Sequence, residues 1–315
     1  MLTRRHIRLK VMQIIYALRI SDFEYTKETE KKLLESIDST YDLYLILISL
    51  LIEILKKAQE KYLISQEKLL SDQNNIYDNK KFIKNQFLNL LKSDRLFNQE
   101  INKRNLNLWD LDFKYVDLIY ENLIKSELFS DYINSDEISY KNDKNFVAKF
   151  YKNIVVRNDK LYSYLEDRNI NWIDDFPLIN TIILKLINKS KEVNSKKYFL
   201  PKLYKDNQDK IFAKDLLKTT LKNYSNYNNE ISKKTKNWDV DRIARLDYIM
   251  LNMALCELIE FKTIPIKVTL NEYIEISKEY STPKSNVFIN GILDSIVKDF
   301  TKRGKIIKEG RGLHE

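Results

Sequence analysis

Apolar residues recur along the chain with the 3.6-residue period of amphipathic helices, and no stretch sustains the alternation typical of a strand. The clearest helical pattern lies between residues 237 and 297, where Pro265 and Pro283 divide it into three segments. Because proline cannot continue a helix, each segment predicts a separate helix. The sequence therefore predicts an all-α fold in the form of a helical bundle.

The first of these helices is apolar on most of its surface, which indicates a buried position. Its apolar residues are Ile243, Leu246, Ile249, Met250, Leu251, Met253, Ala254, Leu255 and Leu258. In the third helix, the residues that form a narrower inward stripe are Ile289, Ile292, Leu293, Ile296 and Phe300. Phe288 falls about 100° from the centre of that stripe, and Gly291 lies near the same flank with room for a close approach. This placement leaves two interpretations open: a ring that stacks on a ligand, or a ring packed at the rim of the core with a neighbouring helix close to Gly291.

Residues 3–20 predict a first helix, with Thr3 as its N-cap and a narrow core-facing stripe. The stripe consists of Ile7, Val11, Ile14, Ile15 and Leu18. Arg5, Arg8 and Tyr16 share the adjoining face with Met12 and Arg19, and Arg4 precedes them. Guanidinium groups and an aromatic ring are the groups that bind phosphates and bases of single-stranded RNA, so this face is a candidate RNA site. An ordinary solvated helix face is the alternative.

The middle of the chain, residues 21–205, is also helical by pattern, with a long amphipathic helix from Leu34 to Leu55 and another from Val116 to Leu123. Residues 71–81 and 130–143 are polar and predict loops. Phe146 and Phe212 are separated by 66 positions, as are Trp172 and Trp238, so residues 146–190 form either a degenerate internal repeat or a chance match. Residues 301–315 predict a flexible basic tail.

Composition narrows the function classes. The net charge of +9 favours a polyanionic partner, although a chain rich in lysine reaches such a charge without one. All four glycines lie near the carboxyl terminus, so glycine-rich nucleotide-binding motifs are absent. Two histidines and one cysteine leave little material for a metal site or a Cys–His nucleophile. We therefore expect no catalytic residue, no metal and no cofactor.

The pattern also predicts where the protein acts. With a single cysteine, Cys256, no internal disulfide is possible, which suits a reducing compartment. No signal-peptide pattern follows the basic amino terminus, and the longest apolar run, residues 43–55, is too short to span a bilayer. We expect a soluble cytoplasmic protein with no membrane partner.

Three ordered motifs then point to a family. They are W-x-x-D-R-x-x-x-x-D-x-x-x-L-x-x-A-x-x-E-L from Trp238, I-P-x-K-V-x-x-N-E-x-x-E-x-x-K from Ile264, and F-x-N-G-x-L-D from Phe288. Together they resemble the carboxy-terminal half of the NusB family of transcription antitermination factors. The amino terminus is similar too, with Arg4, Arg5 and Arg8 in R-R-x-x-R followed by Q-I-I-Y at residues 13–16.

The resemblance implies a NusB-like core over residues 206–300, against which the arginine-rich helix of residues 1–20 packs. It implies binding to boxA-type single-stranded RNA of ribosomal RNA operons, together with a NusE-like small-subunit ribosomal protein, in an elongating RNA polymerase complex. The RNA-binding residues that carry over are Arg4, Arg5, Arg8, Tyr16, Asp247 and Phe288. The segment before Phe288 departs from the family pattern, with Pro283 and Lys284 where small and acidic residues are usual.

Two other functions stay open at this point. NusB-like domains also precede ribosomal-RNA cytosine methyltransferases, but that activity needs a glycine-bearing cofactor domain that this sequence lacks. The other is a protein-interaction scaffold in which residues 21–205 dominate and RNA binding has been lost. Affinity for boxA RNA separates a scaffold from an antitermination factor.

Overall fold

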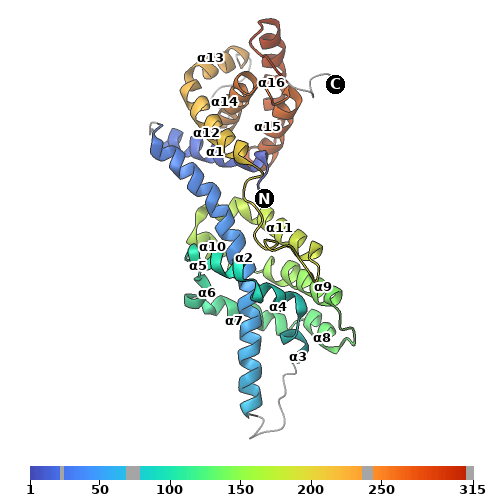
Figure 1. Ribbon diagram of the computed structural model, residues 1–315. Coiled ribbons are helices and arrows are strands. Elements are labelled where there is room, and N and C mark those ends of the chain that lie inside the picture. The colour runs from blue at the N-terminus through green and yellow to red at the C-terminus, as the bar shows by residue number, and fades with distance from the viewer. Residues whose placement is uncertain (22–24, 69–78, 236–243, 310–315) are drawn as a thin grey trace. The chain divides into compact units, whose positions relative to one another are not determined.

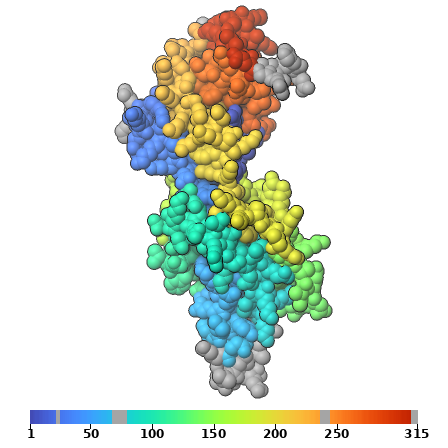
Figure 2. All heavy atoms as spheres, viewed as in Figure 1, coloured from blue at the N-terminus to red at the C-terminus, as the bar shows by residue number. Residues whose placement is uncertain are grey.

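The computed structural model describes residues 1–21, 25–68, 79–235 and 244–309 (Figure 1). Within these ranges the regular structure is helical and no residue is assigned to a strand, so the all-α prediction is confirmed. The chain divides into two compact units. The first unit comprises Met1–Ile37 and Leu203–Glu315, and the second comprises Asp38–Lys202. With all heavy atoms drawn, side chains cover the face of each unit that is in view (Figure 2).

The first unit is a bundle built around α14. Its helices are α1 (Arg4–Ile20), the beginning of α2 (Lys27–Lys68), α12 (Asn207–Lys222), α13 (Tyr224–Lys234), α14 (Arg245–Glu260), α15 (Ile266–Tyr280) and α16 (Ser285–Lys302). α14 contacts α1, α12, α13, α15 and α16, which confirms that this helix is buried on most sides. Its predicted beginning, with Trp238, Arg242 and Ile243, lies outside the described residues. Pro265 occupies the N-cap of α15, and α16 begins two residues after Pro283, as the two proline breaks predict.

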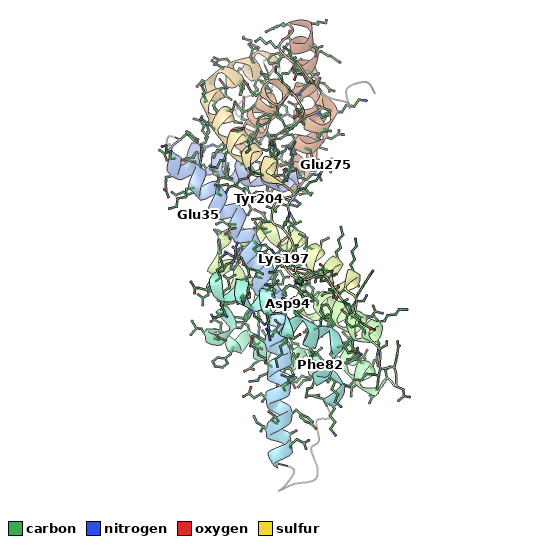
Figure 3. All side chains as sticks on the ribbon, in the orientation of Figure 1. Glu35, Phe82, Asp94, Lys197, Tyr204 and Glu275 are labelled. Atoms are coloured by element: carbon green, nitrogen blue, oxygen red, sulfur yellow. The ribbon has the colours of Figure 1, made fainter. Side chains whose placement is uncertain are left out.

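The second unit surrounds the rest of α2, whose buried residues include Leu43–Ile48. Its other helices are α3 (Lys80–Ile83), α4 (Gln86–Ser93), α5 (Arg95–Lys103), α6 (Leu108–Leu111), α7 (Phe113–Ile124), α8 (Glu127–Asn134), α9 (Tyr140–Phe150), α10 (Asp159–Arg168) and α11 (Phe176–Lys189). A π-helical turn, Tyr151–Val155, follows α9, and a 3₁₀ turn, Ile170–Asp175, precedes α11. Phe82 packs edge-on against Phe129 and Phe146, and Asp94 caps α5 by accepting from the Phe97 N–H at 2.8 Å (Figure 3).

Two predicted loops are partly helical in the structure, and within residues 130–143 the polar residue Ser139 caps a helix. Ser126 accepts from the Phe129 N–H and Ser139 from the Asn142 N–H, so α8 and α9 occupy much of residues 130–143. α3 begins at Lys80, inside the other predicted loop, whose residues 71–78 lie outside the described ranges. The internal repeat stays a prediction, since its second copy includes Trp238, also outside those ranges.

The described part of the basic tail, residues 301–309, is fixed against the first unit by hydrogen bonds, where the sequence predicts flexibility. Gly304 has a φ of +63° and ends α16, with the Lys305 N–H donating to the Phe300 carbonyl at 2.9 Å. Lys308 Nζ donates to the carbonyl oxygens of Glu257 and Phe261, 3.0 Å each, and so satisfies the last turn of α14. Burial lowers the pKa of Lys308 to about 8.

Candidate nucleic-acid interface

Thr3 fixes the beginning of the arginine-rich helix α1. Its backbone is extended, with φ −101° and ψ 164°, and the structure confirms it as the N-cap. The Thr3 N–H donates to His6 Nδ1 at 3.3 Å, which is the hydrogen bond of a capping box between the N-cap N–H and the side chain at N3. Three arginines therefore leave the first turns of α1 at defined positions, and none of the first-turn residues is acidic.

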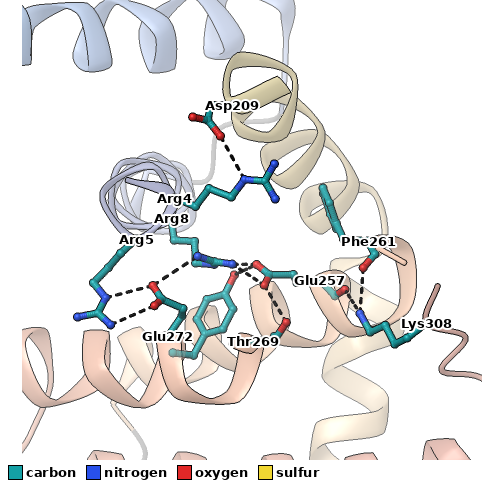
Figure 4. Close-up of polar contacts among 10 residues, drawn as sticks. Arg4, Arg5, Arg8, Asp209, Glu257, Phe261, Thr269, Glu272 and Lys308 are labelled. Carbon is teal, nitrogen blue, oxygen red and sulfur yellow. Dashed lines mark hydrogen bonds and ion pairs between the residues drawn. The ribbon is translucent and has the colours of Figure 1, made fainter. Parts of the chain in front are cut away.

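Each of the three arginines meets a carboxylate from a different helix (Figure 4). Arg4 Nε lies 3.2 Å from Asp209 Oδ1, and Arg5 donates two hydrogen bonds, of 3.1 and 3.0 Å, to Glu272. Arg8 donates two hydrogen bonds, of 2.8 and 2.6 Å, to Glu257. The carboxylates offset the unfavourable meeting of positive side chains with the positive end of the helix dipole.

Arg8 and Glu257 form a buried ion pair in the middle of the bundle. Their side chains are 2% and 0% exposed, and Glu257 also accepts from Thr269 Oγ1 at 2.8 Å and from the Tyr273 hydroxyl at 3.4 Å. Burial lowers the pKa of Arg8, but hydrogen bonding to Glu257 and its charge outweigh this, so the pKa is raised. The expectation that Arg8 shares an accessible face of α1 with Arg5 and Tyr16 is wrong, because α12, α14 and α15 enclose the first half of α1.

Arg4 and Arg5 instead lie at the rim of this network, with side chains 40% and 39% exposed. Tyr16 is exposed further along α1 and presents its ring to solvent. The guanidinium of Arg4 also lies 5.0 Å from the centre of the Phe212 ring, which limits its orientations. Of the residues that the resemblance singles out, Arg4, Arg5 and Tyr16 are therefore accessible to a ligand, and the others are buried.

Asp247 fastens the connection between α15 and α16. Its carboxylate is buried and accepts from Ser281 Oγ and from Ser285 Oγ, both at 2.6 Å. The segment between these two serines carries Pro283 and Lys284, both exposed. Asp247 thus sets the position of an exposed segment while its own oxygens stay inside.

Phe288 is 6% exposed, so the expectation that its ring lies outside the core is wrong. Both α14 and α15 pack on α16, and the apolar surface they enclose is broader than the stripe through Ile292 and Ile296. Gly291 is exposed, and a Cβ atom added there would meet no atom within 4 Å. No neighbouring helix among the described residues therefore approaches this glycine closely.

The acidic partners are the residues that the sequence interpretation missed. Glu257 stands in a helix that is apolar on most sides, where a charge needs an opposite charge nearby. That rule alone predicts a buried cation for Glu257. Nothing in the sequence pattern indicates which of Arg4, Arg5 and Arg8 it meets.

The part of the chain that the structure describes offers no metal site, no reactive thiol and no membrane-spanning helix. No group of three or more His, Cys, Asp or Glu residues there is placed to hold a metal ion. Burial raises the pKa of the Cys256 thiol to about 12, so it is a poor nucleophile at neutral pH. The described helices include none with the length and apolar character needed to cross a membrane.

Comparison with known proteins identifies the bundle. The NusB family model matches residues 178–298. The transcription antitermination protein NusB of Salinibacter ruber is 42% identical over 111 residues, which are 35% of this chain and 69% of that protein. Its counterpart in Chloroherpeton thalassium is 36% identical over 108 residues, 34% of this chain and 51% of that protein.

A third relative, the protein of the same name from Finegoldia magna, is 40% identical over 28% of this chain and 64% of that protein. Among solved structures, T. maritima NusB shares 33% identity over 36% of this chain and 81% of that chain, with a TM-score of 0.30. The chain thus spans from about half to just over two thirds of the lengths of its curated relatives. By sequence identity over these shared lengths, the chain belongs to the NusB family.

Proposed function

We propose that this protein is a non-catalytic transcription antitermination factor. In this proposal it binds boxA-type single-stranded RNA of ribosomal RNA operons together with a NusE-like small-subunit ribosomal protein and acts on the elongating RNA polymerase. The names of the curated relatives support the class of function. The observation that carries the proposal is the half-exposed Arg4–Arg5 pair, on a helix held in place by the buried Arg8–Glu257 pair.

Arg4 and Arg5 contact phosphates in this proposal. Arg5 faces the partly exposed carboxylate of Glu272, and exposed ion pairs contribute only about 0–1 kcal/mol, so a phosphate is able to displace that carboxylate. Arg4 meets the buried carboxylate of Asp209 through Nε, and in this proposal it keeps that pair while it contacts a phosphate. Arg5 uses a bidentate geometry toward Glu272, and a phosphate accepts the same two parallel hydrogen bonds. Glu272 is then a competitor of RNA for Arg5.

Tyr16 supplies a ring on which a base stacks, since it is exposed on the same helix. The three buried residues that the resemblance singles out do not touch RNA in this proposal but hold the RNA-binding surface in position. Arg8 fixes α1 against α14, Asp247 fixes the exposed segment before α16, and Phe288 packs that helix into the core. Their substitution changes RNA affinity through the position of the surface.

The test is a titration of labelled boxA RNA and of a scrambled RNA, each at several salt concentrations, with and without the purified NusE-like ribosomal protein. We expect tighter binding of boxA than of scrambled RNA, and a further gain when the ribosomal protein joins. Arg5→Gln should reduce the log–log salt slope by about 0.7, the value for one single-strand phosphate contact.

Arg95→Gln is the matched control for Arg5→Gln. Arg95 is an exposed arginine of α5, in the second unit, and among the described residues it has no carboxylate partner. Its loss changes the net charge equally but should leave the salt slope unchanged. Equal affinity for boxA and scrambled RNA, or absence of binding to both, would contradict the proposal and favour a protein-interaction scaffold.

A further inference from the structure

A cationic pocket lies in the first unit, at the other end of α1 from Arg4 and Arg5. It has a volume of about 360 Å³ and is formed between the end of α1, α13 and the beginning of α14. Arg19 and Arg245 line it together with Tyr224, Tyr248 and Asn228. Among the described residues that line it, none is acidic.

The two arginines of this pocket differ from those of the amino-terminal network. Arg4, Arg5 and Arg8 each meet a carboxylate, whereas neither Arg19 nor Arg245 has a carboxylate partner among the described residues. Two like charges from elements far apart in sequence therefore line one pocket, and no carboxylate of the described residues neutralises them. Such an arrangement is complementary to an anion.

Contacts within the pocket fix the orientations of a guanidinium group and of an amide group that could contact a ligand. The Arg19 guanidinium lies 3.8 Å from the centre of the Tyr224 ring, so its plane is supported on one side. Asn228 Oδ1 accepts from Asn252 Nδ2 at 2.7 Å, and Asn252 is completely buried. Because the oxygen of the Asn228 amide is engaged, its nitrogen is the group left to donate toward a ligand.

These features combine the chemistry of a nucleotide site. Guanidinium groups bind phosphate oxygens, while a supported guanidinium plane and tyrosine rings accept a base by stacking. We propose that the Arg19–Arg245 pocket binds a nucleotide of the RNA that flanks the boxA element. This inference rests on the proposed function and extends it from one RNA contact to two.

The spacing of the two sites defines the RNA that reaches both. Arg5 and Arg19 are 14 positions apart on α1, which corresponds to about 21 Å along the helix axis. At about 3.4 Å per nucleotide in a stacked strand, this is about six nucleotides. With boxA bound at the Arg5 end, an added flank of about ten nucleotides on one side is longer than this separation and therefore reaches the pocket.

The experiment compares boxA RNA without a flank and with a flank on its 5′ or its 3′ side. The variant is the Arg19→Gln/Arg245→Gln double substitution. Its control is Arg95→Gln/Arg157→Gln, which removes two exposed arginines of the second unit that also lack carboxylate partners among the described residues. Melting curves should be unchanged in both variants, because all four side chains are exposed.

We expect the pocket variant to bind one of the flanked RNAs more weakly and with a log–log salt slope smaller by about 1.4, twice the single-contact value. Its affinity for boxA alone should equal that of the unsubstituted protein. A pocket variant that binds both flanked RNAs as tightly as the control variant does would overturn the proposal.

Failure of the two proposals is distinguishable. Loss of preference for boxA with retained, pocket-dependent binding of flanking RNA would contradict the boxA assignment and support the pocket. Weaker capture of the purified NusE-like protein in the absence of RNA, with unchanged RNA titrations, would assign the pocket to a protein and overturn it as an RNA site.

Discussion

Arg8 in α1 and Glu257 in α14 are joined by two hydrogen bonds of 2.8 and 2.6 Å, and water reaches neither side chain appreciably. The pair links the amino-terminal helix to the central helix of the bundle across 249 positions of sequence. Removal of Glu257 leaves the buried Arg8 with only the longer contact, 3.4 Å, to Glu272, and the loss of a buried partner costs far more than the pair itself contributes.

We therefore predict that Glu257→Gln lowers the free energy of unfolding by about 3–5 kcal/mol. Equilibrium unfolding in urea measures the change. Glu275→Gln is the control, since Glu275 forms an exposed pair with Lys278 at 2.6 Å and its loss should cost no more than about 1 kcal/mol. Similar small costs for both substitutions would show that Arg8 finds water or another acid when Glu257 is neutral.

Substitution of Glu272 should strengthen RNA binding. Its carboxylate holds the Arg5 guanidinium that the proposal assigns to a phosphate. Glu272→Gln removes this competitor, so we predict tighter binding to boxA RNA, by up to about fivefold for an ion pair that contributes up to about 1 kcal/mol. Titration at low and moderate salt checks it, with Glu275→Gln as the control for net charge. Weaker binding by the Glu272 variant would mean that the carboxylate orients Arg5 for RNA.

Substitution of Phe288 distinguishes a buried ring, as observed, from the ring outside the core that the sequence pattern predicts. Because its ring is buried, Phe288→Ala should lower the free energy of unfolding by about 3–5 kcal/mol. Phe288→Leu retains most of the volume and should cost less than about 1.5 kcal/mol. A melting curve of the alanine variant that matches the unsubstituted protein would place the ring outside the core, as the sequence pattern predicts.

The fold and the site differ in how far the sequence predicts them. Period 3.6 and the two prolines predict the helices and the breaks between α14, α15 and α16, because these depend on local chemistry. The position of a side chain on a helix does not settle its burial, since that depends on how many neighbours pack around it. Arg8 and Phe288 both lie beside a core stripe, and both are covered by neighbouring helices. Arg8 is covered by helices from the opposite end of the chain, and Phe288 by α14 and α15, which precede its own helix.

His6 should make the protein sensitive to mild acid. Burial, and then the charge of Arg5, lowers its pKa to about 4, well below the ordinary value near 6.5. Between these values the unfolded chain binds a proton that the folded protein does not, so stability decreases as the pH falls from about 6.5 to about 4.

His6→Gln tests this, because glutamine is suited to the third position of a capping box and does not titrate. We predict that the variant loses less stability than the unsubstituted protein between pH 7 and pH 5, as measured by urea unfolding at each pH. Equal losses would assign the acid sensitivity to other groups.

Gly291 offers the last test, since it separates helix stability from RNA contact at one position. It lies within α16, is exposed, and leaves open space where a Cβ atom would be. Alanine is more favourable than glycine in a helix interior by about 0.5–1 kcal/mol, so Gly291→Ala should raise the melting temperature by a few degrees. Gly304→Ala is the contrasting control: with φ at +63°, the same substitution strains the backbone and should destabilise the protein. If RNA binds only through α1 and the pocket at its end, Gly291→Ala leaves RNA affinity unchanged. A more stable variant that binds RNA more weakly would instead show that an RNA backbone approaches α16 where its side chain is missing.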